Sequence, residues 1–123
     1  MTDTINMLNK ILDDTKKVGG VESAVIVSRD GLLITSNFPS SDSTRAETFA
    51  AMSATMLGAA ETATTELGKG TPDRVIVESE HGKLIATGAG PKALLVVLTK
   101  LDAGLGLILV ELEKAAEKIK KIL

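Results

Sequence analysis

The sequence contains no cysteine, tryptophan or tyrosine, and only two phenylalanines and one histidine among its 123 residues. Without cysteine, the chain cannot form disulfides, thiolate nucleophiles or cysteine-ligated metal sites. Nucleic acid is bound by a basic face, with aromatic side chains where single strands are stacked. Because the net charge is −2 and aromatics are scarce, we expect no nucleic-acid binding. The lack of cysteine also suits a reducing cytoplasm, where we expect the protein to reside.

Long hydrophobic runs are missing as well. The N-terminal segment, residues 1–17, carries charged and polar residues throughout, unlike a signal peptide or a transit sequence. The longest uncharged run, residues 48–60, is shorter than the stretch of about 20 residues that crosses a bilayer. We therefore expect no membrane insertion. Hydrophobic residues still make up 44% of the chain, which is enough for a core, and we expect a single domain over residues 1–123.

The apolar periodicity predicts helices and strands in the order α-β-β-α-β-β-β-α. The predicted helices span residues 4–17, 44–67 and 106–123, and the predicted strands span residues 22–28, 32–36, 74–79, 83–89 and 93–99. We expect Ser43 or Thr44, together with Glu47, to cap the second helix. The turns between the last three strands are too short for a crossover helix, so these strands should form an antiparallel meander.

The predicted fold is a three-layer α/β/α sandwich of the α+β type around a five-stranded antiparallel sheet. The first and last strands are apolar at consecutive positions, which is typical of strands covered on both faces. If these two strands are neighbours, the strand order is 2-1-5-4-3 and the second and third strands are edges. We interpret Ser28-Arg29-Asp30-Gly31 as the turn of the first hairpin, with Gly31 supplying backbone freedom and Asp30 capping local amides.

The second predicted helix carries no charged residue from Thr48 to Ala60. Only one helix face can pack on the sheet, yet the other faces carry methionine and small residues where a solvent-exposed helix normally carries lysine and glutamate. Gly58 costs about 1 kcal/mol relative to alanine in a helix interior, and close packing against another helix would offset that cost. We interpret the helix as an association surface. The alternative is an alanine-rich helix selected for propensity alone.

We predict that this helix and the third strand form one continuous dimer interface. The third strand is an exposed edge with apolar residues at its centre, and such an edge favours pairing across a two-fold axis. The expected interface residues are Met52, Thr55, Met56, Ala59, Ala63, Val75 and Val77.

No pattern in the sequence predicts a catalytic, cofactor or metal site. His81 is the only histidine, and with Glu78 and Glu80 on a hairpin turn it is better explained as part of a solvated turn than as a metal ligand. The glycine-rich stretches lack the spacing of a phosphate-binding loop. The segment DAGLGL does open a helix with free amides, but such helix starts are common. We therefore expect no enzyme activity. An enzyme whose site these patterns do not reveal is the least favoured hypothesis.

The element order, the hairpin VSRDGLLITS, the small-residue second helix and the final segment LDAGLGLILVELEKAAEKI together resemble the roadblock family, the dynein light chain type. The resemblance covers residues 4–123 and is greatest to stand-alone archaeal and bacterial members. It implies that the second helix covers one face of the sheet and the other two helices the opposite face. It also implies a dimer formed through the second helix and the third strand.

Members of this family scaffold or regulate small Ras-like GTPases and have no enzymatic site of their own, although some bacterial relatives stimulate GTP hydrolysis by their partner. The resemblance therefore implies a homodimeric, non-enzymatic regulator of, or binding platform for, a small Ras-like GTPase. The alternative is a structural scaffold subunit of a larger assembly, with no effect on a nucleotide cycle. We do not expect Arg29, Arg45 or Arg74 to act as an arginine finger.

Overall fold

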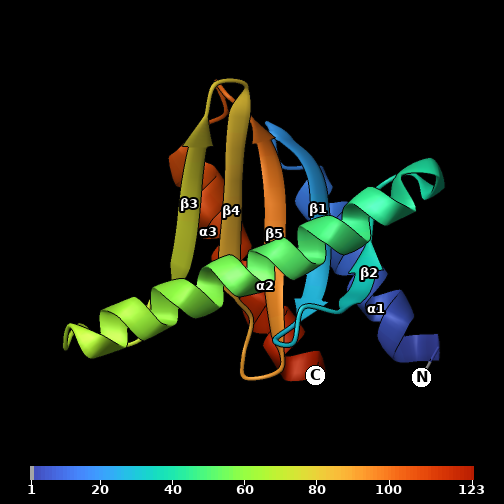
Figure 1. Ribbon diagram of the computed structural model, residues 1–123. Helices are drawn as coiled ribbons and strands as arrows, with labels where there is room; N and C mark the ends of the chain where they lie inside the picture. The colour runs from blue at the N-terminus through green and yellow to red at the C-terminus, as the bar shows by residue number, and fades with distance from the viewer. Residues whose placement is uncertain (1) are drawn as a thin grey trace.

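The computed structural model of the protein describes residues 2–123 (Figure 1). The elements in chain order are α1 (Thr2–Lys16), β1 (Val21–Ser28), β2 (Leu33–Ser36), the short 3-10 helix η1 (Ser40–Asp42), α2 (Ser43–Glu66), β3 (Arg74–Ser79), β4 (Gly82–Gly88), β5 (Ala93–Lys100) and α3 (Leu105–Ile122). Apart from η1, this is the order predicted from the sequence.

The five strands form one antiparallel sheet in the order β2-β1-β5-β4-β3, which confirms the predicted topology. The two longest strands, β1 and β5, lie side by side at the centre, with Val25 opposite Val96. The pairing of β1 with β2 is irregular between Ile26 and Val27. Consequently β2 and β3 are the edges, each hydrogen-bonded to one neighbouring strand.

Successive residues of the central strands pack into two different cores, because side chains alternate between the faces of a sheet. Ala24 and Ile26 of β1 join the core beneath α1 and α3. Val25 and Val27 of the same strand join the core beneath α2. This division explains the continuous apolar runs in the sequence, since both faces of the central strands are covered.

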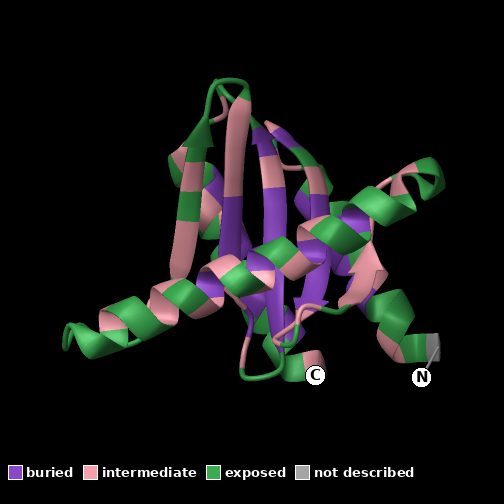
Figure 2. Ribbon diagram, in the orientation of Figure 1, coloured by how far each residue is buried: buried purple, intermediate pink, exposed green. Residues whose placement is uncertain are grey.

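The two faces of the sheet are covered unequally. Helices α1 and α3 lie on one face, while α2 crosses the other face diagonally as a single long helix (Figure 1). The parts of β3, β4 and β5 beyond α2 are only half-buried on the α2 side (Figure 2). There Val77 pairs with Leu84, which pairs in turn with Leu98, so the three side chains form a row across the sheet.

The turn between β1 and β2 is confirmed, but its polar contacts differ from those expected. Gly31 has a φ of 89°, in the left-handed region that favours glycine. The backbone N–H of Leu32 donates to the hydroxyl of Ser28 at 3.0 Å. The local amide is thus capped by Ser28, whereas Asp30, to which this role was assigned, is exposed.

The start of α2 also differs from the expectation. The helix begins at Ser43, directly after η1, and the cap residue is Asp42, which makes no side-chain cap hydrogen bond. The predicted cap by Ser43 or Thr44 with Glu47 is therefore wrong. The preceding 3-10 turn leads directly into the helix. Within it, the N–H of Asp42 donates to the carbonyl of Pro39 at 2.8 Å, so this amide has a partner without a side-chain cap.

Candidate interaction surface on helix α2

The outward face of α2 is exposed and carries no charge over four turns. Met52 has 62% of its surface exposed, while Ala46, Ala50, Ser53 and Leu57 are buried on the opposite side of the helix. The exposed residues recur every three or four positions and therefore share one face. They are Thr48, Met52, Thr55, Ala59, Thr62 and Ala63. At 1.5 Å per residue, this face is about 22 Å long.

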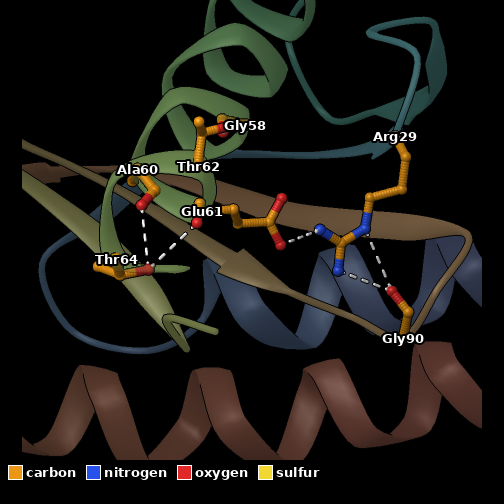
Figure 3. A network of polar contacts seen from close by, with 7 residues as sticks. All are labelled: Arg29, Gly58, Ala60, Glu61, Thr62, Thr64 and Gly90. Carbon is orange, nitrogen blue, oxygen red and sulfur yellow. Dashed lines mark hydrogen bonds and ion pairs between the residues drawn. The ribbon is translucent and has the colours of Figure 1, made fainter. Parts of the chain in front are cut away.

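Two of the three threonines on this face, Thr55 and Thr62, turn their hydroxyls back onto the helix. Thr55 donates to the carbonyl of Ala51 at 3.0 Å. Thr62, which Figure 3 shows beside Gly58, donates to the carbonyl of that residue at 3.1 Å. A hydroxyl bonded in this way needs no further acceptor. The surface left for contact is therefore mainly methyl groups and the Met52 side chain, so it is more apolar than its sequence indicates.

Glu61, the one charged residue between Thr48 and Ala63, is held away from the exposed face. Its Oε2 accepts a hydrogen bond from Nη1 of Arg29 at 3.1 Å. The Nε and Nη2 atoms of Arg29 also donate to the carbonyl of Gly90, at 3.2 and 2.8 Å. Figure 3 shows Arg29 lying between the helix and the β4–β5 turn. The arginine therefore joins three segments, and the carboxylate that it binds lies on the side of α2 away from the exposed face.

Gly58 lies at the margin of the exposed face with open space above it. A methyl group built at this position would meet no atom within 4 Å. The packing within the described chain therefore gives no reason for glycine in mid-helix, although glycine costs about 1 kcal/mol there. A neighbouring helix that approaches closely would supply such a reason.

The open part of the sheet continues this surface. A hollow of about 410 Å³ lies over Val77, Leu84 and Leu98. A second hollow of about 330 Å³ lies between the sheet and the first turns of α2, and it is lined by Phe38, Phe49 and again Leu98. Leu98 lines both hollows, so they adjoin beside α2. Their lining is mainly apolar, although Lys83 and Arg45 also take part in it.

The sequence-predicted residues fall into three groups. Met52, Thr55, Ala59 and Ala63 share the exposed face of α2. Met56 is half-buried and packs against the core beneath the helix. Val75 and Val77 are half-buried on the edge strand β3, on the side of the sheet that faces α2.

Sequence reasoning missed four residues of this region: Thr48 and Thr62 on the helix, and Leu84 and Leu98 on the sheet. The spacing of Thr48 and Thr62 from Met52 was a usable signal, since all three fall on one helical face. No comparable signal existed for the leucines, because their exposure depends on the angle at which α2 crosses the sheet.

Among residues 2–123, no group of three histidine, aspartate or glutamate side chains is placed to hold a metal ion. The side chain of His81 is 90% exposed, and its Nε2 lies 3.8 Å from the carboxylate of Glu80, as expected of a solvated turn. No helix in the described part of the chain is long and apolar enough to span a membrane. Apolar contact is the chemistry that the exposed face of α2 offers.

Residues 7–99 match the Roadblock/LC7 domain family. The chain is also 40% identical over 114 residues to the protein MJ1340 of Methanocaldococcus jannaschii, covering 93% of this chain and 97% of that protein. The chain therefore belongs to the Roadblock/LC7 domain family, which confirms the resemblance drawn from the sequence.

Solved structures share the fold. MglB of Myxococcus xanthus superposes with a TM-score of 0.86 at 22% identity, covering 96% of this chain and 88% of that one. An MglB described with a tetrameric arrangement gives a TM-score of 0.85 at 22% identity, covering 97% and 89% of the two chains. At this level of identity the likeness establishes the architecture alone.

Proposed function

We propose that this protein is a homodimeric binding platform for a small Ras-like GTPase and regulates it without an enzymatic site of its own. The observation that carries the proposal is the exposed, chargeless face of α2. An apolar face of this length is costly to leave in water, and patches of this kind mark sites of protein association.

The dimer is formed by α2 and the edge strand β3. A second copy related by a two-fold axis places the same face of α2 against itself, and such an isologous contact suits a surface without charge because no like charges meet. The outer edge of β3 is unpaired within the described chain. Antiparallel pairing of two β3 strands would satisfy its backbone groups and join the two sheets into one.

The surface that binds the GTPase lies beside this dimer contact, on the part of the sheet that α2 leaves half-buried. In a dimer, the depressions over Leu98 of the two protomers would flank the paired helices and present one broad apolar surface. Membership of the Roadblock/LC7 family supports a GTPase as the partner, because regulation of small Ras-like GTPases is the role that the family resemblance implies. The MglB described with a tetrameric arrangement is one protein of this fold that associates with copies of itself, which supports a dimer here.

Regulation acts by holding one conformation of the GTPase and not through an arginine finger. Arg29 is engaged by Glu61 and Gly90, and Arg74, with 27% of its side chain exposed, lies 3.7 Å from Glu113. Arg45 is 75% exposed, but it lies 3.8 Å from Asp42 at the start of α2. A binder shifts a conformational equilibrium only if it prefers one state, so the GTP- and GDP-bound partner should bind with different affinities.

The test is direct binding to a Ras-like GTPase from the same cell, loaded with GDP or with a non-hydrolysable GTP analogue, with GTP hydrolysis as a second readout. We expect binding to one nucleotide state at least about tenfold tighter than to the other. Absence of binding in both states would contradict the GTPase role and favour the scaffold subunit. Loss of binding in Leu98→Glu, with folding and dimerisation retained, would assign the platform to the open sheet.

A further inference from the structure

The face of the sheet opposite α2 carries a second surface, along the seam between α1 and α3. The two helices run antiparallel there. Met7 near the start of α1 lines a hollow with Ile122 at the end of α3. Val18, just after α1, lines a neighbouring hollow with Glu111. The proposed dimer leaves this seam open, because it uses α2 and β3 on the other side and edge of the sheet.

The seam has an apolar floor. The larger hollow, at the Met7 end, has a volume of about 350 Å³. Its apolar residues are Met7, Ile11 and Ile122, and Met7 is 51% exposed. The smaller hollow shares Ile11, Asp14 and Lys118 with it, so the two adjoin. From Met7 to Val18 the seam is about 16 Å long, which corresponds to three turns of a helix.

The rim of the seam is basic. Lys114, Lys118 and Lys121 lie at spacings of four and three residues on α3, so they form one row along the groove. Lys114 is paired with Glu111 at 3.4 Å. Within residues 2–123, neither Lys118 nor Lys121 has a carboxylate within 4.0 Å.

The carboxylate on the α1 side of the rim is already neutralised. Asp14 lies 3.8 Å from Lys10 and 3.9 Å from Lys17, so it has a lysine on each side. The residues around the larger hollow comprise three lysines and this one aspartate. The larger hollow thus combines an apolar floor with a net positive rim, whereas two lysines and two carboxylates line the smaller one. The Met7 end of the groove therefore selects for a ligand that is apolar on one face and acidic beside it.

We propose that the α1–α3 seam docks an acidic amphipathic helix of a partner protein. Apolar side chains of the ligand, spaced at i, i+4 and i+7, enter the hollows, and its flanking carboxylates meet Lys118 and Lys121. A basic helix is rejected by the same lysines. A second copy of this chain is not the occupant, because self-association through this seam would set the two lysine rows against each other.

The probe is a fluorescein-labelled synthetic peptide of about four helical turns, with leucines at i, i+4 and i+7 and glutamates on both flanks. A matched peptide has every glutamate replaced by lysine. Fluorescence anisotropy should show the acidic peptide binding with a Kd near or below about 100 µM at low salt, weakening as salt is added. The basic peptide should bind at least about tenfold more weakly.

Protein variants locate the contact. Lys118→Glu with Lys121→Glu should weaken binding of the acidic peptide at least about tenfold. The control, Lys69→Glu with Lys92→Glu, makes the same change in net charge at exposed positions outside the seam and should bind as the wild type does. Met7→Gln removes apolar floor from a half-exposed position and should weaken binding several-fold. Thermal unfolding by circular dichroism checks that each variant is folded.

The proposal is overturned if both peptides bind equally, if the control variant loses as much affinity as the seam variant, or if the acidic peptide fails to bind at about 1 mM. Binding to phosphatidylserine vesicles that the acidic peptide does not displace would assign the lysines to a membrane surface and overturn it as well. The seam and the proposed dimer contact lie on different faces of the sheet. The Met52→Glu variant should therefore bind the acidic peptide with the same affinity as the wild type.

Discussion

The guanidinium of Arg29 lies 3.1 Å from the carboxylate of Glu61 and joins the β1–β2 turn to the second half of α2. The same arginine holds the carbonyl of Gly90 in the β4–β5 turn. Helix α2 crosses the sheet as a single diagonal element (Figure 1), so a polar contact with two turns beneath it helps to fix the crossing angle. That angle determines how much of the sheet stays open beside the helix.

Removing Arg29 should therefore destabilise the protomer more than removing its partner. Arg29→Ala leaves the Gly90 carbonyl without its donor and should lower the free energy of unfolding by about 1 kcal/mol. Glu61→Ala should lower it by about 0.5 kcal/mol, since the pair is one-third exposed and partly screened. A double-mutant cycle in urea, at fixed protein concentration, should give a coupling of about 0.5 kcal/mol. A coupling energy of zero would contradict the claim that the Arg29–Glu61 contact stabilises the fold.

Met52→Glu should dissociate the dimer without unfolding the protomer. The side chain is 62% exposed in the protomer, so the change should alter protomer stability by no more than about 0.5 kcal/mol. In the proposed dimer it would bury an unpaired charge, at a cost of several kcal/mol. Leu107→Glu is the matched control, because Leu107 is 63% exposed but lies on α3. Light scattering should show a monomer for the first variant and a dimer for the second.

Met56→Glu should behave differently from Met52→Glu. Met56 is half-buried against the core beneath α2, so a carboxylate there weakens the protomer as well as the dimer. We expect a lower free energy of unfolding in urea, by about 1–3 kcal/mol. Equal unfolding midpoints for the two variants would contradict the assignment of Met52 to the outer face.

Gly58→Ala should stabilise the protomer and weaken the dimer. The new methyl group meets nothing within 4 Å, and alanine is favoured over glycine in a helix by about 1 kcal/mol. If a partner helix packs closely over Gly58, the same methyl group raises the dimer dissociation constant. Gly106→Ala, on α3 and equally unobstructed, is the control that should leave dissociation unchanged. Analytical ultracentrifugation that finds both variants as tightly dimeric as the wild type would rule out close helix packing at Gly58.

The dimer should resist salt. Its contact face lacks charge, so screening has little to weaken, and salts that strengthen burial of apolar surface should tighten it. The dissociation constant from ultracentrifugation should change less than about threefold between 0.05 and 1 M sodium chloride. A steep loss of association with salt would contradict a contact made by the chargeless face of α2.

The sheet order could be predicted because the information is local. The apolar runs of β1 and β5 indicate central strands covered on both faces, and short turns force the antiparallel meander. The hydrogen bond from Arg29 to the carbonyl of Gly90 joins residues 61 positions apart. No local sequence pattern indicates such a contact. The sequence therefore predicts only that Arg29 belongs to the turn between the first two strands.

The orientation of α2 could be predicted only in part. Because the helix is apolar on several sides, its periodicity does not decide which methionine faces outward. Met52 and Met56 were consequently assigned to one interface, although Met56 packs inward. The hydroxyl contacts of Thr55 and Thr62, which make the outer face more apolar, depend on side-chain rotamers that a sequence does not specify.

The central claim is that the chargeless face of α2 joins two copies of this chain. Size-exclusion chromatography with multi-angle light scattering of the wild-type protein tests it most directly. We predict a single species of about twice the chain mass of 12.8 kDa, persisting in high salt. A monodisperse species at 12.8 kDa, unchanged up to concentrations of about 100 µM, would contradict the account.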